Sequence, residues 1–291
     1  MLPITRRRLL AAMALSPLLW QQTLRAETID AQRIIALEWL PLELMMALGV
    51  VPLGAAELFN YRDWVSKPEL PASVIDVGLR TEPNLELLTQ LKPSLILYSS
   101  GYGPSPERLA RIAPSQGFAF NSGEGKPLTT ARQSLTQLAQ RIDKVPQAQA
   151  HLEMFDSLIA DTRARLAPRA KKPLLLMSLI DKGHAIVFGK NSLFLEVMQL
   201  LGLENAWQGE TSFWGSAIIG IERLAAIHDA DVLCLSHGDE RLMQQIETTE
   251  LWQSLPFVRQ QRFTRVPTVW FYGATLSAIQ FCHVLDNALE A

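Results

Sequence analysis

Residues 76–107 read DVGLRTEPNLELLTQLKPSLILYSSGYGPSPE, and this stretch predicts a helix and a strand with a loop beside each. Its leucines at positions 85, 87, 88 and 91 predict an amphipathic helix that Pro93 ends. The apolar run at 95–98 predicts a short buried strand. Arg80 then lies just before the helix, and Tyr102 lies just after the strand. Because such loops gather at the carboxyl edge of an α/β sheet, where ligands bind, we expect Arg80 and Tyr102 to point into a cleft.

The same alternation of strand and helix surrounds this stretch. Residues 41–48 predict a helix that ends at Gly49, and Tyr61 and Trp64 lie in a less regular polar segment. The strands predicted in this half cover residues 33–37, 51–55, 75–78, 95–98 and 118–120. Short strands that alternate with helices predict a mainly parallel α/β layer.

A long helical region separates this half from a second α/β half. Residues 128–142 predict one helix, and residues 146–166 predict a second that is charged on one face. The second helix is either a surface helix of one domain or a rigid connector, and we prefer the connector because α/β alternation resumes at residue 174. Further strands are predicted at 174–180, 185–188, 231–236 and 263–266, and further helices at 192–201, 221–227 and 274–289. The predicted organisation is a leader at 1–26, an N-terminal lobe at 27–143, a connecting helix at 144–167 and a C-terminal lobe at 168–291.

The first 26 residues combine Arg6, Arg7 and Arg8 with an apolar run at 11–20 and end at Ala26. This pattern predicts a secretory signal peptide of the twin-arginine type, removed near Ala26, and hence a periplasmic mature protein. A membrane anchor is the alternative, but the run is shorter than the roughly 20 residues that span a bilayer. Without the four arginines of this segment, the 27 basic residues fall to 23 against 29 acidic ones. A net charge of −6 argues against a nucleic-acid partner.

Familiar enzyme and metal motifs are missing from the sequence. The chain has no G-x-S-x-G elbow, P-loop, G-x-G-x-x-G or H-E-x-x-H motif. The five histidines are scattered, and His151 is expected on a helix surface. Cys234 and Cys282 could pair in an oxidising compartment, but both lie in apolar segments, so we expect buried free thiols. These absences disfavour an exported enzyme and a structural zinc site.

Aromatic residues recur at the expected ends of strands and in loops of both halves. They are Trp39, Trp64, Tyr98, Tyr102, Trp214, Trp270 and Tyr272. Any one of these side chains is more often a core or lid residue than a ligand contact, but their shared position favours a shared role. Aromatic walls with few polar groups are typical of small-molecule sites.

Several segments resemble the iron-siderophore binding proteins of bacterial ABC importers, in particular those for ferric hydroxamates. The segments are residues 77–88, 101–107, 205–210, 213–215 and 269–277. The likeness covers nearly the whole chain, including the twin-arginine start. It implies two α/β lobes joined by a single long helix, the helical-backbone or class III type of periplasmic binding protein. The ligand would lie in a shallow cleft between the lobes.

The resemblance also implies roles for individual residues. Arg80 and Tyr102 would donate hydrogen bonds to the hydroxamate oxygens, and Ile186 would add an aliphatic contact. The aromatic walls would include Trp39, Trp64, Tyr98, Trp214, Trp270, Phe271 and Tyr272. Glu107 and Glu222, one acid on each lobe, would dock on arginines of an inner-membrane ABC permease that works with its ATPase. The protein would be a monomer without a cofactor of its own, because the siderophore holds the iron.

The chemistry of a ferric hydroxamate agrees with a single basic anchor. Three hydroxamates satisfy the iron and leave the metal centre without net charge, so the protein needs one hard donor group rather than a metal ligand. A guanidinium supplies a fork of N–H donors that stays charged. A triply anionic catecholate complex should require several basic residues. This argument favours hydroxamates, and the resemblance implies ferrichrome, coprogen, ferrioxamine and aerobactin as ligands. The alternatives are a binding protein for a catecholate, cobalamin or haem, and an exported enzyme.

Overall fold

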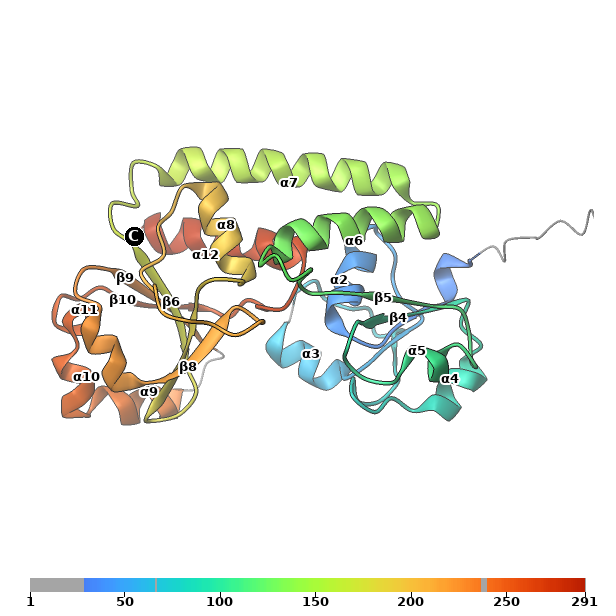
Figure 1. The fold of residues 1–291 in the computed structure, drawn as a ribbon, viewed down its shortest axis with the longest axis horizontal. Helices are drawn as coiled ribbons and strands as arrows, with labels where there is room; N and C mark the ends of the chain where they lie inside the picture. Colours follow the sequence, from blue (N-terminus) through green and yellow to red (C-terminus); the bar gives the residue numbers. More distant parts are fainter. Residues whose placement is uncertain (1–28, 66, 237–239, 291) are drawn as a thin grey trace, which may run out of the picture.

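The computed structural model describes residues 29–65, 67–236 and 240–290, and it shows two α/β lobes spanned by one long helix (Figure 1). The predicted fold class is confirmed. The predicted signal peptide lies outside the described residues. No helix within the described ranges is long and apolar enough to cross a membrane.

The first lobe is built on a five-stranded parallel sheet in the order β3-β2-β1-β4-β5. Its strands are β1 (Ile34–Ala36), β2 (Gly54–Ala55), β3 (Ile75–Asp76), β4 (Leu95–Ser99) and β5 (Ser115–Phe118). Ile34 and Ile35 of the central strand point to opposite faces, and both are fully buried because apolar layers cover the sheet on each side. The strand predicted at 118–120 lies earlier, since β5 pairs with β4 from Ser115 onward.

Helices of the first lobe begin where the sequence supplies caps. Asn84 accepts a hydrogen bond from the backbone N–H of Leu87 (3.0 Å) and so starts the predicted helix α4. The segment that we expected to be irregular is the helix α3, whose buried side is only Leu58 and Tyr61. An apolar side that short gives little periodicity to detect. The helices are η1 (Ala31–Arg33), α2 (Trp39–Ala47), α3 (Leu58–Trp64), α4 (Leu85–Leu91), α5 (Pro106–Leu109) and α6 (Pro127–Arg141).

The second lobe has a mixed five-stranded sheet in the order β10-β9-β6-β7-β8. Its strands are β6 (Leu174–Leu179), β7 (His184–Phe188), β8 (Ser216–Gly220), β9 (Asp231–Ser236) and β10 (Phe263–Pro267). The predicted hairpin of β6 and β7 is confirmed by their antiparallel pairing. The pattern did not indicate β8, an edge strand on which Ile218 is 67% exposed. The helices are α8 (Leu193–Leu201), η2 (Ile221–Ala226), α9 (Glu240–Glu247), α10 (Glu250–Ser254), α11 (Pro256–Arg259) and α12 (Thr275–Glu290).

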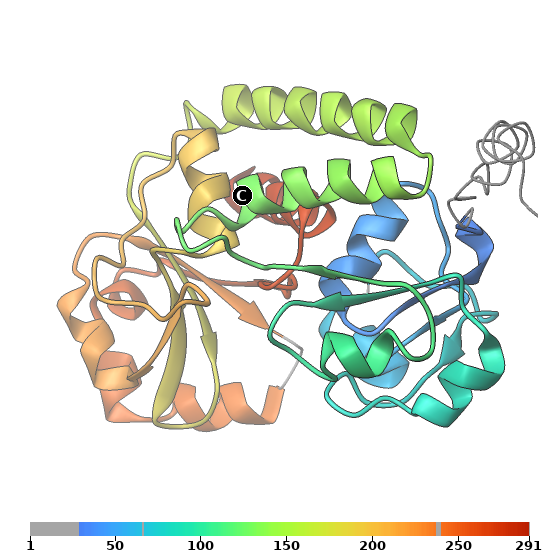
Figure 2. The same ribbon diagram turned by 45° about the vertical axis from the view of Figure 1, so that its right-hand side comes forward.

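The helix predicted at 146–166 is α7 (Val145–Leu166), and it runs along both lobes in two different views (Figures 1 and 2). It packs against α6, α8 and α12. Arg132 of α6 forms a two-pronged ion pair with Asp156, and Arg165 bonds to Asp286 of α12. The connector is therefore fixed to helices of both halves.

The C-terminal segment returns to the first lobe before α12 begins. Trp270 and Ala274 are buried in the same apolar core as Trp39 and Leu40 of α2. These residues belong to the predicted C-terminal lobe at 168–291. The chain between β10 and α12 thus reaches the core of the first lobe.

Two carboxylates make reciprocal contacts across the boundary of the lobes. Glu196 of α8 accepts a hydrogen bond from the backbone N–H of Leu128 (2.7 Å) in the first turn of α6. Glu43 of α2 accepts one from the backbone N–H of Ala274 (2.7 Å) at the start of α12. Each half thus caps a helix of the other half, where backbone N–H groups lack partners within the helix.

Buried polar and sulfur-containing side chains complete the core. His151 was expected on a surface but is buried, because α7 packs over α12; its Nε2 lies 2.8 Å from Thr275 Oγ1. Cys234 and Cys282 are buried and free, as predicted. Burial raises the pKa of the Cys234 thiol to about 11, so this sulfur is unreactive at neutral pH.

Candidate ligand-binding site

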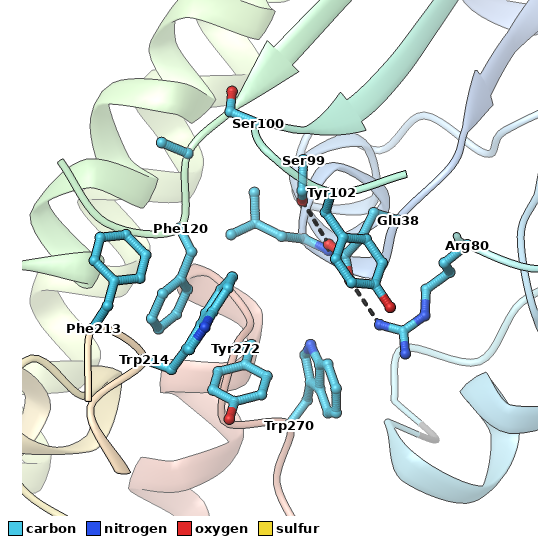
Figure 3. Close-up of a pocket in the computed structure, with 12 residues that line it drawn as sticks. Glu38, Arg80, Ser99, Ser100, Tyr102, Phe120, Phe213, Trp214, Trp270 and Tyr272 are labelled. Carbon is cyan, nitrogen blue, oxygen red and sulfur yellow. Dashed lines mark hydrogen bonds and ion pairs between the residues drawn. The ribbon is translucent and has the colours of Figure 1, made fainter. Parts of the chain in front are cut away.

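A cavity of about 290 Å³ lies between the two lobes. It is lined by Glu38, Leu40, Arg80, Ser99, Ser100, Tyr102, Ala119, Phe120, Phe213, Trp214, Trp270 and Tyr272. Figure 3 shows Arg80, Tyr102 and Glu38 on one side, Phe120, Phe213 and Trp214 on the other, and Trp270 and Tyr272 between these groups. The cavity therefore has a polar end and an aromatic end.

The polar end forms because two loops at the carboxyl edge of the first sheet meet. Arg80 follows β3 and Tyr102 follows β4. Gly103 has a φ of +78°, and a Cβ there would lie 2.7 Å from the carbonyl oxygen of Arg80. Glycine is required at this position by both the backbone angle and the close approach. The predicted meeting of Arg80 and Tyr102 at one sheet edge is confirmed.

Arg80 is held by two carboxylates that the sequence analysis did not single out. Its Nε donates to Glu57 Oε2 (2.6 Å), and its Nη1 donates to Glu38 Oε1 (2.9 Å). The guanidinium carbon lies 3.7 Å from the ring centre of Trp39, within cation–π range. Nη2 makes no hydrogen bond with any described residue, so it remains available to a ligand oxygen. Burial opposes the charge, but the bonds to Glu57 and Glu38 outweigh it and raise the pKa of Arg80.

Glu38 links three elements of the site. Besides Arg80, it accepts hydrogen bonds at Oε2 from the Leu40 backbone N–H and the Ser99 hydroxyl, each at 2.8 Å. Glu38 thereby caps α2, and the bond from Ser99 of β4 orients its carboxylate. Glu57 holds its carboxylate in place from a left-handed backbone position, φ 53° and ψ 49°. An acid two residues after the end of β1 and another two residues after the end of β2 were a visible signal, because those strands end at the same sheet edge as Arg80.

The aromatic end consists of rings in mutual contact. Trp214 stacks on Phe120, with ring centres 5.6 Å apart, and its centre lies 5.3 Å from that of Tyr272. Tyr272 meets Trp270 edge to face at 5.4 Å. Burial raises the pKa of Tyr272, so its hydroxyl stays a neutral donor. Trp214 is 40% exposed and Phe213 is 51% exposed, so large apolar area is available for a ligand. Phe120 and Phe213 were missed, although Phe120 ends the strand predicted at 118–120 and Phe213 directly precedes Trp214.

The cavity brings together Arg80, Tyr102, Trp214, Trp270 and Tyr272, but the other predicted contacts lie elsewhere. Trp39 is buried beneath Arg80 and donates its indole N–H to the Ala56 carbonyl (3.1 Å). Tyr98 packs on the opposite face of the first sheet, because strand alternation turns it away from Leu97. Ile186 and Phe271 pack against the core of the second lobe.

Trp64 lies in a second opening between the lobes. This opening has a volume of about 450 Å³ and is lined by the end of α3, by residues of β6, β9 and α9, and by Ile180, which follows β6. Trp64 is 43% exposed there. Its predicted role as a wall of the Arg80 cavity does not agree with this placement.

The predicted docking acids occupy helix starts, as expected. Glu107 lies in the first turn of α5 on the first lobe, and Glu222 lies in the first turn of η2 on the second lobe. Both side chains are exposed. In the part of the chain that the structure describes, no group of three or more His, Cys, Asp or Glu side chains could hold a metal ion.

Comparison with known proteins places the chain in a family. The sequence profile of the periplasmic binding protein family, Peripla_BP_2, matches residues 34–269. The chain belongs to this family of binding proteins. The resemblance seen in the sequence and the two-lobed fold are thus both confirmed.

Individual proteins of known ligand class are similar to this chain over most of its length. The iron(3+)-hydroxamate-binding protein FhuD of Escherichia coli is 58% identical over 98% of this chain and 97% of its own length. A crystal structure of the siderophore-binding protein FhuD from Vibrio cholerae, bound to Fe3+-Desferal, superposes with a TM-score of 0.82. That protein is 30% identical, and the match covers 90% of this chain and 99% of the other. The triscatecholate siderophore binding protein FeuA from Bacillus subtilis, 16% identical with a TM-score of 0.69 and coverages of 89% and 92%, shares the fold alone.

Proposed function

We propose that this protein captures ferric hydroxamate siderophores in the periplasm and delivers them to an ABC permease for iron uptake. The observation that carries the proposal is the pairing of one partly buried arginine with an aromatic wall in the cavity between the lobes. The named ligands of the two FhuD relatives support the same class. The protein binds its ligand without converting it.

The polar end of the cavity suits a neutral metal complex better than an anionic one. Arg80 carries one positive charge, and Glu38 and Glu57 beside it carry two negative charges. Nη2 of Arg80 and the hydroxyl of Tyr102 supply donors for oxygen atoms that keep partial negative charge. A triply anionic catecholate complex would meet a net negative anchor and be repelled.

Titration of intrinsic tryptophan fluorescence tests the ligand class, because Trp214 and Trp270 line the cavity. We expect saturable quenching by ferrichrome, coprogen or ferrioxamine, and none by the same siderophores without iron. Ferric catecholates, haem and cobalamin should give no saturable response. A saturable response to one of these and none to any ferric hydroxamate would replace the proposed ligand class with the alternative chelate.

Delivery to the permease is proposed to use one acid on each lobe. Glu107 and Glu222 are both exposed, so they are free to meet arginines of a membrane partner. We propose that the protein acts as a monomer after removal of a twin-arginine signal peptide near Ala26. Transport of radiolabelled ferric hydroxamate into cells that carry the matching permease is the direct measurement.

A further inference from the structure

Glu43 is a buried carboxylate that the binding site itself does not use. It lies on α2 with 1% of its surface exposed, and no described residue forms an ion pair with it. Its Oε2 accepts hydrogen bonds from the backbone N–H groups of Ala274 (2.7 Å) and Ser277 (3.2 Å). Its Oε1 accepts one from the Ser277 hydroxyl. Three donors at the start of α12 thus converge on one carboxylate from the other half of the chain.

The backbone at Gly273 leaves room for this carboxylate. A Cβ on Gly273 would lie 2.3 Å from Glu43 Oε1 and 2.1 Å from Ser277 Oγ. The carboxylate therefore occupies the space that a side chain at this position would take. On its other side, Thr275 is fully buried and contacts His151 of α7. The first turn of α12 is fixed from both α2 and α7.

The residues just before this turn form part of the ligand cavity. Trp270 and Tyr272 line the cavity, and Gly273 follows directly. Trp270 also meets Trp39 of α2 edge to face, with ring centres 4.8 Å apart. The cap of α12 thus begins at Ala274, two residues after the cavity residue Tyr272.

We propose that Glu43 is a positioning residue for ligand binding: its ionised carboxylate caps α12 and thereby holds Trp270 and Tyr272 in the geometry that the ligand requires. This inference rests on the proposed function and adds a residue that does not touch the ligand. A carboxylate is the stronger acceptor for three donors, and its charge interacts favourably with a helix N-terminus. Protonation removes that charge and fills one acceptor site.

The proton equilibrium of Glu43 falls in an accessible pH range. Burial raises its pKa from an ordinary 4.5 to about 7, against the lowering effect of the bonds from Ser277 and Ala274. The titratable groups that interact with it are Glu38 at the start of α2 and Tyr61 of α3, while His151 of α7 contacts the neighbouring Thr275. Glu38 adds a repulsion that favours the protonated form, while burial and Arg132 lower the pKa of His151.

Affinity and stability should respond to pH with opposite signs. Because the pKa of Glu43 is raised in the folded protein, the folded state holds this proton more tightly than the unfolded chain does. The stability that Glu43 contributes is then fully present below pH 4.5 and is lost as pH rises toward 7. Ligand binding should strengthen over the range near pH 7, because the ionised form holds the wall. A purely structural role would not produce rising affinity together with falling stability.

The experiment is a series of ferrichrome titrations by tryptophan fluorescence from pH 5.5 to 8.5. For a single group with pKa near 7, wild-type affinity should rise by up to about tenfold between pH 6 and 8. Glu43→Gln should bind weakly and show less than about a twofold change over the same range. Glu196→Gln is the matched control, because Glu196 caps α6 across the same boundary but holds no wall residue, and it should keep the wild-type profile.

Ser277→Ala provides a second test if Glu43→Gln does not fold. The bond from Ser277 lowers the pKa of Glu43, so its removal should move the midpoint of the affinity profile to higher pH. A flat wild-type profile, or a profile that persists unchanged in Glu43→Gln, would overturn the inference. Absence of ferric hydroxamate binding at every pH would instead refute the proposed function, and the two failures are thus distinct.

Discussion

The first-lobe face of the cleft holds Arg80 in ion pairs with two carboxylates, whereas the opposite face offers aromatic rings with little polar support. Arg80 is fixed by Glu38 and Glu57, and its side chain is only 17% exposed. Phe213 and Trp214 are 51% and 40% exposed, and they rest on Phe120 and on each other. The polar face is built before a ligand arrives, while the aromatic face keeps area that only a ligand would cover.

This difference assigns separate tasks to the two faces. A preformed arginine with directional donors selects oxygen atoms at a defined position, because hydrogen bonds to charged groups are directional and strong. Stacked rings contribute affinity in proportion to the area they bury and tolerate changes in ligand shape. We therefore expect the polar face to decide which metal complexes bind and the aromatic face to decide how tightly related complexes bind.

Arg80→Ala should produce the largest loss of binding. The ligand loses a charge-assisted donor, and Glu38 and Glu57 are left without their partner, so ferrichrome affinity should fall by about 100-fold. Isothermal titration calorimetry measures this change. Arg108→Ala, an exposed arginine of α5, removes the same charge outside the cavity and should bind as the wild type does. Equal losses in the two variants would show that net charge, not the anchor, matters.

Trp214→Ala should have the next largest effect and should act on all ferric hydroxamates alike. Loss of a stacked ring and its buried area should weaken binding by about tenfold. Trp214→Phe keeps a ring against Phe120 and should recover most of the affinity. If the Ala variant instead changed which metal complexes bind, the assignment of selectivity to the polar face would be wrong.

The sequence predicted those features of the polar face that depend on a local pattern of residues. Arg80 and Tyr102 could be placed at one sheet edge because Pro93, the leucine spacing and the apolar run before Tyr98 mark a helix and a strand. Glu38 and Glu57 were not recognised as partners of Arg80, since an ion pair across 42 or 23 residues leaves no local periodicity. Their position two residues after the ends of β1 and β2 was the available signal.

Some of the aromatic residues that the sequence predicted as ligand contacts do not line the cavity. Tyr98 and Leu97 are neighbours, yet strand geometry sends them to opposite faces, so only one can approach the cleft. Trp39 is buried under Arg80 as a support, and Trp64 opens on a different cavity. The path of residues 270–274 back to the first lobe depends on Glu43 at a distance of more than 230 residues, which no sequence window shows.

Tyr102→Phe should have a smaller effect than either variant above. The change removes one neutral donor but leaves the ring beside Arg80, so affinity should fall by about threefold. Ferrichrome titrations on the single variant and on Arg80→Ala with Tyr102→Phe measure the coupling of the two donors. Additive losses would show that they act on separate ligand oxygens, and a smaller combined loss would show that Arg80 orients the hydroxyl.

Glu107→Ala and Glu222→Ala should have the smallest effect on binding, because neither acid lines the cavity. We expect ferrichrome affinity to change by less than about twofold, which is the range of ordinary surface substitutions. Transport by cells that express the matching permease should nevertheless fall in each variant, and further in the double variant. Glu86→Ala, an exposed acid of α4, is the control for lost negative charge on the first lobe. Normal transport by the double variant would show that docking does not depend on these two acids. A loss of ligand affinity would mean that the polar face extends beyond the Arg80 network.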